Sequence, residues 1–136
     1  LPIIRQISAG SFYNVCLSVD NEVYSFGQNN CGQLGTGDFT DCNYPQKIST
    51  VLVESNEVNG EYTFRIVSKD LCDIDFIQCG SYSSVCKSFS GDIYVFGNNA
   101  QGQLGIGNTY NQNITFKVLD WPDNIVDIKM GFRHTV

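Results

Sequence analysis

The chain has 136 residues, 42% of them hydrophobic, which is enough to bury a core. Its formal net charge is −6 with only eight Lys and Arg residues, so the composition argues against a phosphate-binding surface for nucleic acid. No apolar stretch approaches the roughly 18 residues that a membrane span needs. Because the sequence opens with Leu1-Pro2 and no charged-then-apolar leader, we expect an excerpt of a longer protein.

The sequence repeats itself at a spacing of 70 residues. Residues 7–37 and 77–107 align without a gap, and 15 of these 31 positions are identical. A third copy begins at Ile128 and runs to the end of the sequence. Units that repeat at such a period pack on one another, so we expect this chain to need further repeats, from a longer chain or from other copies.

Each repeat predicts short strands and few helices. In the first repeat, residues 15–19 and 22–26 are rich in β-branched and aromatic side chains and flank a turn-forming Asp-Asn pair. In the second, residues 85–89 and 93–96 flank a Ser-Gly-Asp turn in the same way. No stretch of a dozen residues keeps an apolar period of 3.6, which would indicate a helix.

Glycine and one leucine recur at fixed positions. Glycine returning at the same offset predicts backbone with positive φ or no room for Cβ. Neither Gly-Lys-Ser/Thr nor a following helix accompanies these glycines, which argues against a nucleotide site. We expect the leucine of the shared Gly-Gln-Leu-Gly loop to pack between neighbouring sheets. The markers are Gly10, Gly27, Gly32, Leu34 and Gly35, then Gly80, Gly97, Gly102, Leu104 and Gly105.

The first repeat carries an insertion, because it spans 70 residues where the second spans 51. Two apolar runs there flank Asn59-Gly60, a dipeptide typical of tight hairpins, so we predict an inserted β-hairpin over about 51–67. The insertion is either a loop of no consequence or a protruding arm that binds a partner. The predicted boundaries are about 7–76 for repeat 1, about 77–127 for repeat 2 and 128–136 for the start of repeat 3.

Three of the six cysteines occupy positions typical of buried apolar side chains. Cys16 and Cys86 occupy the same position in the two repeats, and Cys79 stands where the first repeat has Ala9. There is no Cys-x-x-Cys pair and the only histidine is His134, which argues against zinc. Free thiols predict an intracellular protein, cytoplasmic or nuclear. With no calcium-loop pattern and no catalytic arrangement, we expect no cofactor and no enzyme activity.

Together these residues resemble the repeat of the regulator of chromosome condensation family. The shared run is Gly-x-x-x-x-Val-Cys-x-Ser, then Val/Ile-Tyr-x-Phe-Gly-x-Asn-x-x-Gly-Gln-Leu-Gly-x-Gly, and residues 45–48, 116–118 and 131–135 fit as well. The resemblance implies an all-β fold, a partial β-propeller of about two blades plus the start of a third, from a ring of about seven. The family's Trp-Gly is Phe-Gly here, and its His-Thr occurs only at His134-Thr135, where we expect a structural role.

The resemblance implies a protein-interaction module, since relatives serve as docking platforms through loops at the faces of the ring. The loop after the first glycine of each repeat would supply aromatic and arginine side chains, the types favoured at interface hot spots. Packing of these aromatics between blades is the open alternative. The candidate partner-binding residues are Phe12, Tyr13, Tyr82, Phe132 and Arg133.

The resemblance also implies two alternatives to docking. The first is guanine-nucleotide exchange on a Ran-like small GTPase, in which the inserted hairpin would act as a wedge. The second is light sensing, whose repeats in the family carry Gly-Trp-Arg-His-Thr. Here that stretch is Gly-Phe-Arg-His-Thr from Gly131, and the single Trp121 lies in a linking loop, which argues against a tryptophan chromophore.

Overall fold

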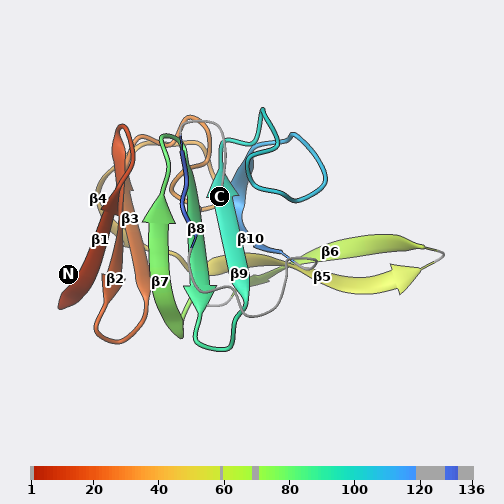
Figure 1. The fold of residues 1–136 in the computed structure, drawn as a ribbon, viewed down its shortest axis with the longest axis horizontal. Coiled ribbons are helices and arrows are strands. Elements are labelled where there is room, and N and C mark those ends of the chain that lie inside the picture. The colour runs from red at the N-terminus through yellow and green to blue at the C-terminus, as the bar shows by residue number, and fades with distance from the viewer. Residues whose placement is uncertain (1, 59, 69–70, 119–127, 132–136) are drawn as a thin grey trace.

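The computed structural model describes residues 2–58, 60–68, 71–118 and 128–131, with the backbone alone for most of the inserted segment. These residues form ten β-strands and no helix (Figure 1). The strands belong to two neighbouring sheets, one for each repeat. The expectation of an all-β fold is confirmed.

The first repeat forms a four-stranded antiparallel meander in which each strand pairs with the next along the chain. Short runs rich in β-branched and aromatic residues favour such strands, and turns rather than long crossovers connect them. The strands are β1 (Ile4–Ala9), β2 (Tyr13–Ser18), β3 (Val23–Gly27) and β4 (Cys42–Lys47).

The second repeat forms the same meander in the same register. Ile7 pairs with Cys16 across β1 and β2, and Ile77 pairs with Cys86 seventy residues later. The sequence repeat is therefore a structural repeat, strand for strand. The corresponding strands are β7 (Ile74–Cys79), β8 (Ser83–Ser88), β9 (Ile93–Gly97) and β10 (Gln112–Val118).

The insertion forms a hairpin that belongs to the sheet of the other repeat. Strands β5 (Thr50–Val58) and β6 (Glu61–Ser68) pair with each other antiparallel along their length. Near its start β5 also pairs with β10 in parallel, through Val51 with Thr115 and Leu52 with Phe116. The rest of the hairpin projects away from both sheets (Figure 1). Asn59, at its predicted turn, lies outside the described residues.

The core lies mainly between the two sheets. Its apolar side chains come from both repeats, so neither sheet could bury them alone. Leu34 of the first Gly-Gln-Leu-Gly loop is fully buried in this seam, and Leu104 is fully buried on the far side of the second sheet. There Leu104 joins a second cluster with the start of the third repeat, formed by Val85, Ile93, Val95, Leu104, Phe116 and Ile128.

Candidate protein-binding face

Loops from three successive repeats meet at one end of the sheets. The loop between β1 and β2 joins the loop between β7 and β8 through a hydrogen bond from the Ser11 N–H to the Ser81 carbonyl at 3.0 Å. The loops enclose a shallow cavity of about 270 Å³. It is lined by residues at equivalent positions of the three repeats, all of them small except Met130: Ala9, Gly10, Ser11, Cys79, Gly80, Ser81, Met130 and Gly131.

The first residue of the loop between β7 and β8, Gly80, must be a glycine because the third repeat approaches it closely. A Cβ on Gly80 would lie 2.6 Å from the carbonyl oxygen of Gly131 and 3.0 Å from Cβ of Met130. Backbone cannot give way as a flexible side chain can. Gly80 therefore allows the second and third repeats to bring their loops together.

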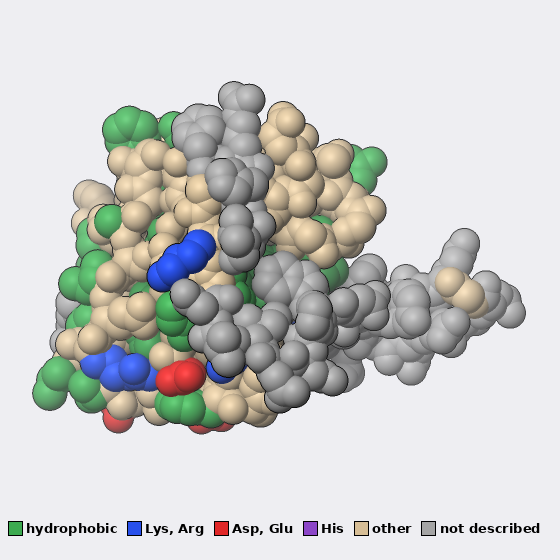
Figure 2. All heavy atoms as spheres, in the orientation of Figure 1, with side chains coloured by type: hydrophobic (Ala, Val, Ile, Leu, Met, Phe, Trp, Pro, Cys, Tyr) green, Lys and Arg blue, Asp and Glu red, His purple; other side chains and the backbone are tan. Residues whose placement is uncertain are grey.

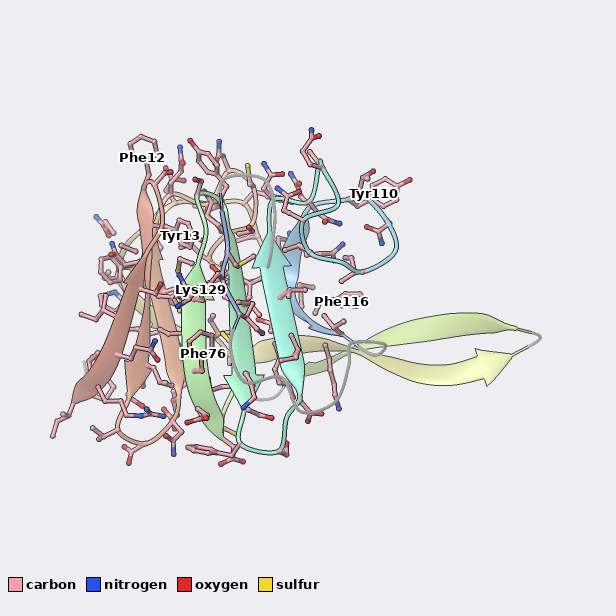
Figure 3. The ribbon with its side chains drawn as sticks, viewed as in Figure 1. Phe12, Tyr13, Phe76, Tyr110, Phe116 and Lys129 are labelled. Carbon is pink, nitrogen blue, oxygen red and sulfur yellow. The ribbon has the colours of Figure 1, made fainter. Side chains whose placement is uncertain are left out.

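Two longer loops lie at the same end, because Tyr13 pairs with Gly27 and Ser83 with Gly97. With the shorter loops they form what we call the loop face. Large side chains project from it, with Phe12 67%, Phe39 53% and Tyr110 75% exposed. Figure 3 shows Phe12 and Tyr110 on this end of the molecule. The loop face comprises residues 10–12, 28–41, 80–82 and 98–111.

The loop face has no Lys or Arg, and its only charged residues are Asp38 and Asp41. Lysines of the strands lie elsewhere, where they form ion pairs such as Lys47 with Glu22 at 2.9 Å and Lys117 with Asp92 at 3.5 Å. Among the coloured residues, Figure 2 shows no Lys, Arg, Asp or Glu side chain along the upper rim of the face in view, where these loops lie. The loop face is thus aromatic, polar and weakly acidic.

A buried asparagine holds the first long loop in one conformation. Asn29 is fully buried, and its Oδ1 accepts the Leu34 N–H at 3.0 Å. Its Nδ2 donates to the Asp38 carbonyl at 3.0 Å, and its own N–H donates to the Asp41 carboxylate at 2.8 Å. A satisfied network of this kind makes a loop rigid.

Asn99 holds the second long loop in one conformation in the same way. It accepts the Leu104 N–H at 3.0 Å and donates to the Asn108 carbonyl at 2.8 Å, while its N–H donates to Asn111 at 2.8 Å. These two asparagines were not predicted from the sequence. The available signal was their recurrence two residues after Gly27 and Gly97.

Of the five predicted partner-binding residues, Phe12 lies exposed on the loop face and Tyr82 is half-buried there. The placement of Tyr13 on this face was wrong. Its ring is 1% exposed and lies in the seam between the sheets, the alternative that the sequence left open. Phe132 and Arg133 lie outside the described residues.

Tyr13 is a buried link between the repeats. Its hydroxyl donates to the Ser83 carbonyl at 2.5 Å and accepts from the Ser84 hydroxyl at 2.9 Å. Both partners belong to β8 of the second sheet. Burial, the main cause, raises the pKa of Tyr13 well above its ordinary value.

Replacing Tyr13 by phenylalanine is expected to lower the free energy of unfolding by about 1–2 kcal/mol, because it removes both of these hydrogen bonds and leaves the buried Ser84 hydroxyl without that acceptor. Urea denaturation followed by circular dichroism measures the loss. The control is Tyr110→Phe, whose side chain is 75% exposed and whose stability should not change. Equal stability of the two variants would contradict a role for Tyr13 as a link.

Comparison with known proteins agrees with this architecture. The family model described as the regulator of chromosome condensation (RCC1) repeat matches residues 20–58 and 90–136, and a second model with the same description matches residues 4–33. The chain belongs to the RCC1 repeat family. The resemblance seen in the sequence is thereby confirmed.

Relatives with RCC1 repeats are much longer than this chain. It is 26% identical to the ultraviolet-B receptor UVR8 of Arabidopsis thaliana over 98% of this chain and 38% of the receptor. It is 27% identical to the human X-linked retinitis pigmentosa GTPase regulator over 85% of this chain and 9% of that protein. A chain in the crystal structure of Kap60 bound to yeast RCC1 (Prp20) superposes with a TM-score of 0.69 at 20% identity, covering 98% of this chain and 29% of that one.

Phenylalanine replaces the tryptophan usual in the RCC1 repeat at two positions. Phe96 is fully buried in the seam between the sheets, and Phe26 is half-buried on the outer side of the first sheet. His134, for which the sequence predicted a structural role, lies outside the described residues.

The thiols of this RCC1-repeat chain are free and fall into two groups. Cys16, Cys79 and Cys86 are buried, whereas Cys31, Cys42 and Cys72 are half-buried. Burial raises the pKa of each of the three buried thiols. A raised pKa reduces the thiolate fraction and hence reactivity.

No helix in the part of the chain that the structure describes is long and apolar enough to cross a membrane. Within the same residues, no three His, Cys, Asp or Glu side chains gather in a way that could hold a metal ion.

Alkaline pH is expected to destabilise the protein. Burial raises the pKa of Tyr94 to about 12 from 10.0, and it raises the pKa of the Cys79 thiol above 9.0. The unfolded chain therefore loses these protons at lower pH than the folded chain, so the stabilisation is full below about pH 9 and is lost as pH rises toward 12. Urea unfolding at pH 8 and pH 10.5 tests this. Tyr94→Phe should reduce the loss, and equal stability at both pH values would contradict the prediction.

Proposed function

We propose that this chain is a docking module that binds partner proteins on the loop face. The observation that carries the proposal is the meeting of loops from three repeats around one cavity, with Phe12 and Tyr110 exposed beside buried, hydrogen-bonded loop cores. A fold alone does not specify a function, so the proposal rests on this surface and not on the propeller architecture.

Two properties of the loop face suit a protein partner. Exposed aromatic side chains offer large contact areas at low cost in conformational entropy, and they dominate binding at many interfaces. Loops held by Asn29 and Asn99 are already ordered, which lowers the cost of association. With two carboxylates and no cation, the loop face favours partners that present Lys or Arg, which also stack on aromatic rings.

The test uses the chain as immobilised bait for proteins of a cell lysate, quantified by mass spectrometry. The double variant Phe12→Ala with Tyr110→Ala is expected to lose specific partners by about tenfold or more, as hot-spot residues do. The matched control is Phe89→Ala, which is 60% exposed in the β8–β9 loop at the opposite end of the sheets. Partners retained equally by all three proteins would overturn docking on the loop face.

Guanine-nucleotide exchange on a Ran-like small GTPase is the second candidate function. The projecting hairpin of β5 and β6 favours it, because such an arm could hold a GTPase in its nucleotide-free state by differential binding. One relative is named a GTPase regulator. Only the start of β5 pairs with β10, so most of the arm is available for contact with a partner.

Release of a fluorescent GDP analogue from a Ran-like GTPase tests exchange. An exchange factor should accelerate release by about a hundredfold or more, since it must favour the nucleotide-free state strongly. A variant in which residues 54–65 are replaced by a short Asn-Gly turn keeps the pairing of Val51 and Leu52 with β10. If the intact chain accelerates release and this variant does not, exchange is assigned to the arm. No acceleration by the intact, folded chain would exclude exchange and leave docking.

A further inference from the structure

The arm formed by β5 and β6 ends in a free strand edge (Figure 1). β6 is the last strand in the order of its sheet, with β5 on one side and, in the part of the chain that the structure describes, no strand on the other. β5 has β10 against its first residues and carries a bulge between Glu54 and Asn56, opposite the consecutive residues Phe64 and Thr63. A bulge interrupts an edge, so the regular β6 is the edge of the arm better suited to pair with a further strand.

The turn of the hairpin decides which residues of β6 present their backbone groups to this edge. Val58 pairs with Glu61, so two residues lie between the strands and the turn closes with the Glu61 N–H directed at β5. Along an antiparallel strand, successive residues direct their N–H and C=O groups to opposite sides. Tyr62 and Phe64 therefore present theirs to the free edge, and Thr63 presents its own to β5.

The order of residue types along β6 is symmetric about Thr63. An aromatic residue follows on each side, Tyr62 and Phe64, and then a charged residue of each sign, Glu61 and Arg65. When two such strands pair antiparallel with Thr63 opposite Thr63, each Tyr62 lies opposite a Phe64 of the other copy. Each Glu61 then lies opposite an Arg65. Threonine, aromatic and opposite-charge pairs are combinations that stabilise directly opposed positions of a sheet.

This register also suits the backbone. Tyr62 and Phe64 both direct their N–H and C=O groups at the edge, so they form hydrogen-bonded pairs on either side of a non-hydrogen-bonded pair of Thr63 residues. An antiparallel register centred on Phe64 would no longer oppose Glu61 to Arg65, and one centred on Arg65 would oppose that residue to itself. Parallel pairing in register would oppose like charges at both positions, which destabilises a sheet.

The hairpin itself does not match the charges of β6 across its ladder. Glu61 pairs with Val58 of β5, and Arg65 pairs with Val53. A second copy of β6 is a neighbour that places the opposite charge at both positions. Such a neighbour also widens the arm, because a two-stranded hairpin is only marginally stable and additional strands stabilise it.

We propose that β6 is a self-association edge, at which the arms of two copies of this chain pair antiparallel about Thr63 to form a symmetric dimer. The contact joins the strands of both arms into one sheet in the order β5-β6-β6-β5. A two-fold axis through the Thr63 pair makes the same edge serve both copies. The contact involves neither the loop face nor the packing of blades, so the inference goes beyond the proposed docking function.

A disulfide at the centre of symmetry tests the register. On mild oxidation of the intact chain, Thr63→Cys is expected to give a dimer with a 63-to-63 disulfide, because Cα atoms of a non-hydrogen-bonded pair lie about 4.5 Å apart, within the span of a disulfide. Mass spectrometry of the linked peptides identifies the bond. The matched control is Asn56→Cys, because Asn56 pairs with Thr63 but lies in β5. The two control thiols would be three strand spacings apart, about 14 Å, and should give at least about tenfold less of their own link.

An exchange of charges tests whether the edges face each other as proposed. Arg65→Glu and Glu61→Arg are each expected to weaken the dimer at least about tenfold in sedimentation velocity, because each opposes like charges at two places. An equimolar mixture of the two variants should restore the dimer, since every opposed pair then carries opposite charges. The net charge of −6 changes by only two in each variant, so both remain negative and general attraction does not explain the restoration.

Three outcomes would overturn the proposal. Absence of both the dimer and the 63-to-63 link would leave the edge to a strand of a different protein. A dimer that neither single charge variant weakens would lie on another surface of the chain. Loss of the dimer in both variants without restoration on mixing would exclude the register about Thr63. Restoration on mixing supports the register and also shows that both variants are folded.

Discussion

Replacing Gly97 by alanine is expected to lower the free energy of unfolding by more than about 3 kcal/mol, the largest effect we predict for a single methyl group. Gly97 ends β9 with φ of +110°, a conformation that residues with a Cβ rarely adopt. Its Cβ would also lie 2.4 Å from the Tyr82 carbonyl oxygen and 2.8 Å from the Ser83 Cα. Both neighbours are backbone of the loop face and of β8, so relief would require separating β8 from β9.

Gly91→Ala is the matched control for this prediction. Gly91 has φ of +95°, but no heavy atom lies within 4 Å of the position its Cβ would take. Gly91→Ala should therefore lower the free energy of unfolding only by the cost of the unfavourable backbone conformation, about 1–2 kcal/mol. Urea denaturation of the parent and both variants measures each loss of stability. The difference between the two losses is the part due to steric overlap at Gly97. Equal losses in the two variants would show that close packing at Gly97 contributes nothing.

Phe96→Ala is expected to lower the free energy of unfolding by about 3–5 kcal/mol, the usual cost of removing a fully buried aromatic ring. Phe96 is fully buried in the seam, among apolar side chains of both repeats. The cavity left behind would be bordered by two sheets whose strands are held by backbone pairing, so little collapse can compensate. The variant should unfold at lower urea concentration and with the two repeats less strongly coupled.

Phe26→Ala is the control, because Phe26 is the same residue type at the equivalent position of the first sheet but is only half-buried. We expect its cost to be about half that of Phe96→Ala or less, since less apolar area is lost from contact. Denaturation of both variants under identical conditions measures the difference. If the two variants lose equal stability, then the seam does not stabilise Phe96 in the way described.

Some features of the molecule were predictable from local sequence. Residues 15–19 and 93–96 have strand-forming composition. The first range lies mostly in β2 and the second lies in β9. The repeated Gly-Gln-Leu-Gly loop led to the expectation that Leu34 packs between sheets, and it is fully buried there. Such inferences succeed because turn chemistry, alternation and backbone freedom act over a few residues.

Other features depended on which elements become neighbours. Phe12 is the last residue of the loop before β2 and Tyr13 is the first residue of β2, yet Phe12 is 67% exposed and Tyr13 only 1%. Adjacent residues of extended chain face opposite ways, but the sequence does not show which of the two faces another sheet. In the same way, the hairpin of β5 and β6 was foreseeable, whereas its pairing with β10 of the other repeat was not.

The sequence by itself therefore determined the two central strands of each repeat, the repeat and the family, because these follow from short-range patterns and from comparing the chain with itself. Only the tertiary structure decided that Tyr13 is a buried link, that Asn29 and Asn99 hold the long loops, and that the inserted hairpin joins the second sheet. The physical reason is the same in each case. Burial and hydrogen bonding are set by contacts between residues far apart in the chain, and a single sequence does not state which of its surfaces meet.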